Sequence, residues 1–120
     1  MRIAEAAAKS GLGIDTIRFY EKSGIVPPID RGADGHRRFT PENLDWLTLL
    51  YWLRQTGMPL KTMRHFATLY RAGDQTISER KSVLLAHASH LAERRQELDQ
   101  CDAVLARKLA IYKSHEEGGA

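Results

Sequence analysis

The residues best suited to chemistry in this sequence lie between positions 15 and 21. The segment reads Asp15-Thr16-Ile17-Arg18-Phe19-Tyr20-Glu21, and it offers a hydroxyl, a guanidinium and a phenol at alternate positions. Arginine suits phosphate oxygens and guanine edges, whereas threonine and tyrosine suit phosphate oxygens. Thr16, Arg18 and Tyr20 are therefore candidate nucleic-acid contacts. The alternative interpretation is a solvated helix face with one surface ion pair.

A second basic motif, Gly35-His36-Arg37-Arg38, follows a stretch that contains Gly32 and Asp34. These residues favour turns, so we expect a small β hairpin, or wing, at residues 26–39. Two adjacent arginines on such a hairpin can reach a neighbouring phosphate backbone or minor groove. Arg37 and Arg38 therefore join the candidate contacts, and the wing favours nucleic-acid binding over a merely solvated face.

Two short helices must position the first motif. The Ala-rich segment Ile3 to Lys9 predicts one helix, because alanine has the highest helix propensity. Ile14 to Lys22 predicts another, with Gly24 as the left-handed residue after its end. A glycine-containing turn joins the two segments, which is typical of a helix-turn-helix.

Two more helices are expected before Gly73. Thr40 is a suitable N-cap and Pro41 a suitable first helical residue, and Gly57 ends that helix. The other helix begins at Pro59-Leu60. Large aromatic residues gather in these two helices, as a core or as a pocket for an apolar or cationic ligand. They are Trp46, Tyr51, Trp52, Phe66 and Tyr70.

The segment from Ile77 to about His115 contains neither glycine nor proline and predicts one long helix. Apolar residues recur in it at every seventh position and form a stripe along one side of the helix: Leu84, Leu91, Leu98, Leu105 and Tyr112. The preceding helices are too few to bury a stripe of this length, so we expect it to pair with the same helix of a second copy. The alternative is a helix that folds back on its own N-terminal domain.

Composition narrows the function classes. The chain has 120 residues, a mass of 13.6 kDa and a net charge of +3. Residues 1–76 hold 11 Lys and Arg against 8 Asp and Glu, and residues 77–120 hold 7 of each. A polyanion is therefore expected to bind the N-terminal part. With no membrane span, no secretory signal and one cysteine, the sequence predicts a cytoplasmic protein.

Enzymatic and metal sites have little support. No glycine-rich phosphate loop, catalytic carboxylate pair or activated nucleophile is apparent, so we expect no enzyme activity and no cofactor. His87 and His90 stand three residues apart on one helix face, but without a third ligand nearby they are interpreted as surface residues. A structural adaptor that uses the long helix to pair proteins is the alternative to a nucleic-acid-binding function.

The ordered motifs resemble the mercury-resistance regulator (MerR) family of bacterial transcription factors. The resemblance rests on Asp15-Thr16-Ile17-Arg18-Phe19-Tyr20-Glu21, Gly24-Ile25-Val26-Pro27-Pro28, Gly35-His36-Arg37-Arg38-Phe39 and Gly57-Met58-Pro59-Leu60. It implies a mostly α protein with a winged helix-turn-helix followed by an antiparallel coiled-coil dimer. It also implies a homodimer that binds a pseudo-palindromic promoter and distorts it, acting on RNA polymerase through the DNA.

From the helix pattern and this resemblance together, we expect a winged helix-turn-helix DNA-binding domain at residues 1–75 and a dimerisation helix at 76–115, followed by a flexible tail at 116–120. The segment Thr68 to Thr76 is closest to the subgroup that responds to aldehydes and other electrophiles. That subgroup has a reactive cysteine in the third helix, where this chain has Trp52. For a small-molecule effector, the open alternatives are non-covalent binding near Trp52 and Tyr70, chemistry at Cys101, or no ligand. We expect Cys101 to be a small residue shielded beside the leucine stripe.

Overall fold

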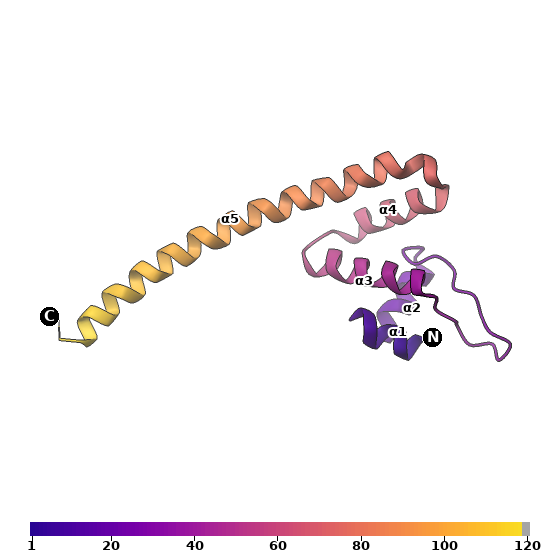
Figure 1. The fold of residues 1–120 in the computed structure, drawn as a ribbon, viewed down its shortest axis with the longest axis horizontal. Coiled ribbons are helices and arrows are strands. Elements are labelled where there is room, and N and C mark those ends of the chain that lie inside the picture. The colour runs from indigo at the N-terminus through magenta and orange to yellow at the C-terminus, as the bar shows by residue number, and fades with distance from the viewer. Residues whose placement is uncertain (119–120) are drawn as a thin grey trace. The chain divides into compact units, whose positions relative to one another are not determined.

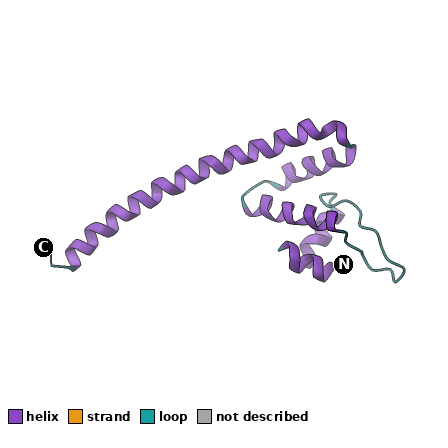
Figure 2. Cartoon of the chain, viewed as in Figure 1, coloured by secondary structure: helices purple, strands orange, loops and turns teal. Residues whose placement is uncertain are grey.

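The computed structural model describes residues 1–118 and is mainly helical (Figures 1 and 2). Its chain folds into two compact units, Met1–Leu84, called the head here, and Leu85–Ala120. The elements are α1 (Ile3–Ser10), α2 (Ile14–Lys22), α3 (Pro41–Gln55), α4 (Leu60–Ala72), the 3₁₀ turn η1 (Asp74–Thr76) and α5 (Ile77–Glu116). The predicted order of five helices is confirmed.

Local sequence signals explain the start of α3 and the end of α2. Thr40 Oγ1 accepts a hydrogen bond from Asn43 N at 3.1 Å, and Asn43 Oδ1 accepts one from Thr40 N at 2.9 Å. This reciprocal capping box begins α3 directly before Pro41. Gly24 has a φ of 82°, a left-handed conformation that lets the chain leave α2 sharply, as predicted.

The core of the head lies between α1, α2, α3 and α4. α1 packs against α2 and α3, and Val83 and Leu84 from the first turns of α5 pack against the same core. Leu84 therefore contributes to the head as well as beginning the stripe. The largest fully buried side chains are Phe39, Ile17, Ile25, Leu47, Leu50, Met63 and Val26.

The wing is less regular than the hairpin expected from the sequence. In the part of the chain that the structure describes, it pairs as β structure at one position, an antiparallel bridge between Arg31 and Arg37. Hydrogen bonds from Gly32 N to His36 O and from Arg38 N to Asp30 O flank the bridge, at 2.9 and 2.7 Å. Phe39 N then donates to Met1 O at 2.7 Å, which ties the end of the wing to the chain's first residue.

The second unit consists of the continuation of α5. In the single chain Leu98, Leu105 and Tyr112 are exposed, and Leu91 is half-buried. Glu116, expected in the tail, is still helical, and the last two residues of that tail lie outside the described residues. Among residues 1–118, no helix combines the length and apolar character needed to cross a membrane.

Candidate nucleic-acid interface

The side of α2 that faces the core carries Ile17 and Tyr20, which are 1% and 3% exposed. They are three positions apart in the helix, so both lie on one face. Burial raises the pKa of the Tyr20 phenol, an effect that the charge of Arg54 partly offsets. The prediction that Tyr20 projects from an exposed helix face is wrong, because its ring completes the core under α2.

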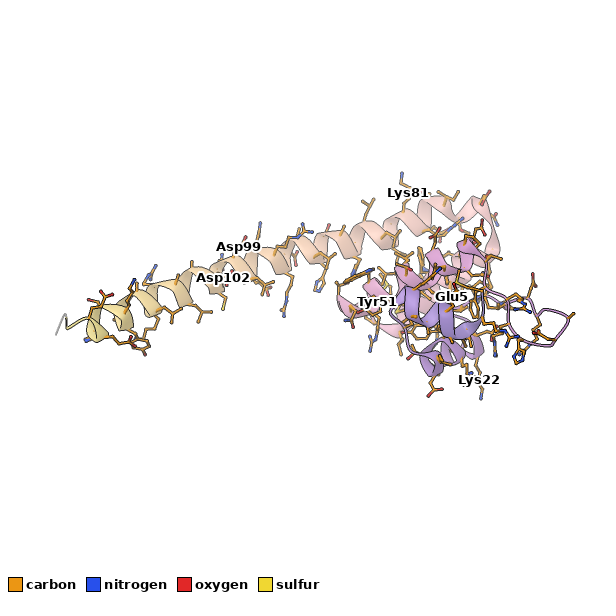
Figure 3. All side chains as sticks on the ribbon, turned by 60° about the horizontal axis from the view of Figure 1, so that its bottom comes forward. Glu5, Lys22, Tyr51, Lys81, Asp99 and Asp102 are labelled. Atoms are coloured by element: carbon orange, nitrogen blue, oxygen red, sulfur yellow. The ribbon has the colours of Figure 1, made fainter. Side chains whose placement is uncertain are left out.

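The outward side of α2 carries Arg18, Phe19 and Lys22, with Thr16 half-buried at its edge. Arg18 lies 3.6 Å from Asp15 in an exposed ion pair that solvent screens, so its guanidinium is available to another anion. Figure 3 shows Lys22 projecting away from the helices of the head. Phe19 and Lys22 were not among the predicted contacts, although helical spacing from the inward Ile17 would have placed them outward.

A basic hollow of about 260 Å³ lies beside Arg18. Three stretches of the chain contribute to it: the residues that begin α1, the outward side of α2, and the wing. Its lining consists of Arg2, Ile3, Ala4, Arg18, Arg31, His36 and Arg37. Four guanidinium groups around one hollow favour an anion such as a phosphate group. Sequence spacing did not single out Arg2, Arg31 or His36, because only the fold brings them to Arg18.

Arg37 is fixed to α2 by Glu21. Its Nε lies 2.7 Å from Glu21 Oε1, and Glu21 Oε2 accepts a hydrogen bond from Ile29 N at 3.0 Å. The two side chains are only 23% and 18% exposed. The expectation that Arg37 is fully exposed is wrong, since one edge of its guanidinium forms this ion pair, whereas its contact with DNA stays a prediction. Its place in the lining of the hollow remains.

Asp34 organises the tip of the wing. It accepts a hydrogen bond from His36 N at 3.1 Å and lies 2.8 Å from Arg2 and 3.1 Å from Arg38. The hydrogen bond from the His36 backbone, helped by the nearby arginines, lowers the pKa of this carboxyl below its ordinary value. Arg38 is exposed, as predicted, and its ion pair with Asp34 lies in solvent.

The C-terminal end of α2 is tied to the helices that follow it. Trp46 Nε1 donates a hydrogen bond to the Ile25 carbonyl oxygen at 2.9 Å, and Arg71 donates one to the Gly24 carbonyl oxygen. The Trp46 ring packs against the Tyr70 ring with 4.6 Å between centroids. α3 and α4 thus fix the orientation of α2 through the residues that directly follow its C-terminal end.

Trp52 and Tyr70, which were expected to share an effector site, contact different aromatic rings. Trp52 is 60% exposed and meets the ring of Tyr51 edge-on at 5.0 Å, whereas Tyr70 contacts Trp46. Six residues of helix rotate Trp52 by about a third of a turn from Trp46, which separates the two rings. Trp52 is therefore not a core residue either.

Cys101 lies on α5 and is exposed in the single chain. Its expected shielding in a dimer stays a prediction. Among residues 1–118, no group of three or more His, Cys, Asp or Glu side chains is placed to hold a metal ion.

Comparison with known families identifies the chain. A family profile described as "MerR HTH family regulatory protein" matches residues 1–68, more than half of the sequence. The chain belongs to the MerR family. A second MerR profile, described as "MerR, DNA binding", matches residues 44–108. The resemblance found in the sequence motifs is thus confirmed, and the chain is a DNA-binding transcriptional regulator of a non-enzymatic family.

Individual relatives support the assignment to the MerR family. An uncharacterised HTH-type transcriptional regulator of Haemophilus influenzae is 41% identical over 92% of this chain and 82% of its own length. The HTH-type transcriptional regulator AdhR of Bacillus subtilis is 32% identical over 78% of this chain and 66% of its own. A solved structure described as HiNmlR, a MerR family regulator lacking the sensor domain, bound to promoter DNA, superposes with a TM-score of 0.86. The two sequences are 39% identical, and the match covers 99% of this chain and 94% of the HiNmlR chain.

Proposed function

We propose that this MerR protein binds a pseudo-palindromic promoter operator as a homodimer and regulates transcription by distorting that DNA. The observation that carries the proposal is the hollow lined by Arg2, Arg18, Arg31 and Arg37, which suits a backbone phosphate. With a phosphate held there, α2 would lie in the adjacent major groove, where Thr16 and Arg18 reach DNA. Arg38 would contact the backbone from the wing.

The second half of the proposal concerns α5. Leu91, Leu98, Leu105 and Tyr112 would pair with the same helix of a second copy as an antiparallel coiled coil. The exposure of Leu98, Leu105 and Tyr112 in the single chain supports this, because proteins rarely leave a contiguous apolar stripe in water. RNA polymerase would be affected through the distorted DNA, and the site of action would be the cytoplasm.

Trp52 stands where the electrophile-responsive subgroup carries its reactive cysteine, so we propose that α3 performs no covalent sensing. Non-covalent binding near the exposed Trp52 or near Tyr70, chemistry at Cys101, and regulation without a ligand remain the alternatives.

Two measurements test the proposed function. A mobility-shift assay with the DNA upstream of the chain's own reading frame should show a discrete complex that unrelated duplex of equal length does not form. In transcription reactions in vitro, the protein should alter expression from that promoter. The family resemblance implies a promoter whose −35 and −10 elements are spaced too far apart, so shortening that spacer to its ordinary length should remove this dependence. Equal binding to both duplexes would contradict the proposal.

A further inference from the structure

The outward side of α2 carries one large apolar side chain. Phe19 is 47% exposed, while its neighbour Tyr20 is 3% exposed. The Phe19 ring contacts the Tyr20 ring at 6.0 Å between centroids, with the planes tilted by 49°. The Phe19 side chain is therefore partly covered and partly open to solvent.

The surroundings of Phe19 exclude an ordinary apolar docking surface. Its exposed neighbours on the same side of the helix are Asp15, Arg18 and Lys22, all charged. A protein interface of useful size would need a wider apolar patch than one ring. A single apolar group flanked by the cations Arg18 and Lys22, with Asp15 paired to Arg18, instead matches the major groove of DNA, where phosphates flank base edges that carry few apolar atoms.

The apolar atom that the major groove exposes is the C5-methyl carbon of thymine. Arg18 and Lys22 are four positions apart, about one helical turn, and their charges can bind phosphates while Phe19 faces the groove floor. We propose that Phe19 packs against a thymine C5-methyl group and thereby sets the preference for a T·A pair in each half of the operator. This inference rests on the proposed DNA-binding function.

The first test changes the DNA and leaves the protein intact. An operator is recovered by in vitro selection from random duplexes, and each thymine in one half-site is replaced in turn by deoxyuridine. This replacement removes the methyl group and keeps the base pairing. One replacement should weaken binding about fourfold, the factor expected for one methyl-sized group returned to water.

The second test is a double-mutant cycle that combines the Phe19→Ala variant with the deoxyuridine replacement. Removal of the methyl group at that thymine should no longer weaken binding by the variant, because the contact is already lost. Lys22→Ala is the matched control. It should weaken binding to every duplex and keep the full effect of the deoxyuridine, since a phosphate contact carries no base information.

Several outcomes would overturn the inference. One is an operator whose thymines can all be replaced by deoxyuridine without loss. Another is a Phe19→Ala variant that keeps the full deoxyuridine effect. If Phe19→Ala unfolds, as its circular dichroism would reveal, Phe19→Leu replaces it in the cycle and should show a reduced effect. Failure of the unaltered protein to bind any selected duplex would instead contradict the proposed function itself.

Discussion

The Glu21 carboxylate and the Arg37 guanidinium form an ion pair with 2.7 Å between Oε1 and Nε, and this pair fastens the wing to α2. Because Glu21 Oε2 also accepts from Ile29 N, one side chain holds both the start and the end of the wing. The pair leaves the other edge of the guanidinium beside the hollow, so Glu21 acts as a positioning residue for Arg37.

We expect Glu21→Gln to weaken operator binding severalfold and to lower the free energy of unfolding by about 1 kcal/mol. Fluorescence anisotropy and urea unfolding measure the two effects. Glu5→Gln is the control, since it removes the same charge from the exposed ion pair with Lys9. Binding by Glu21→Gln as tight as that of Glu5→Gln would show that Arg37 needs no positioning.

Arg18→Ala should weaken DNA binding and leave the fold unchanged, because the Arg18 side chain is exposed and makes only a screened ion pair. The slope of log affinity against log salt concentration should fall by about one unit for the lost phosphate contact. Lys9→Ala removes an equal charge from α1 at a residue outside the hollow and should keep the slope. Equal slopes for Arg18→Ala and the unaltered protein would contradict the assigned face.

The pKa of Asp34 gives the wing a pH dependence. Because folding lowers this pKa, the carboxylate's contribution is complete above the ordinary Asp range and is lost as the pH falls through the folded value. We expect the wing to keep its structure from neutral pH down to about pH 4 and to loosen below it. The amide resonance of His36, whose N–H donates to Asp34, reports the change. In Asp34→Asn this resonance should not titrate in that range.

The Trp46→Phe variant tests the hydrogen bond that anchors the end of α2, because it leaves the aromatic packing of the core in place. The substitution keeps an aromatic ring beside Tyr70 and deletes the donor to the Ile25 carbonyl. Unfolding free energy should fall by about 1–2 kcal/mol, and operator affinity should fall with it. Trp52→Phe is the control, because the exposed Trp52 ring should tolerate the change within about 0.5 kcal/mol. Equal stabilities for the two variants would contradict the anchoring role.

The stripe on α5 can be tested at its centre. Leu98→Glu should convert a dimer into monomer or unfolded protein, since it places an unpaired charge in the proposed coiled coil. Sedimentation velocity and circular dichroism distinguish these states. Gln100→Glu adds a charge two residues away, outside the stripe, and should remain dimeric. A stable dimer of Leu98→Glu would show that the stripe is not the interface.

The sequence by itself determined the elements of this protein. Thr40 and Pro41 begin α3, Gly24 ends α2, and the uninterrupted segment from Ile77 forms α5, because these signals act within a few residues of chain. The basic character of the N-terminal part and the motifs of the family are equally local. For that reason the helical fold and the general function could be predicted without a structure.

Tertiary structure decided which side chains the interface presents. Phe19 and Tyr20 are adjacent aromatics, and only the packing of α2 against the core buries one and exposes the other. Arg37 meets Glu21 across sixteen residues of sequence, and Arg2 reaches the same hollow as Arg18 and Arg31. Such contacts depend on how separate helices and the wing pack against one another. Residue spacing within one element does not determine that packing.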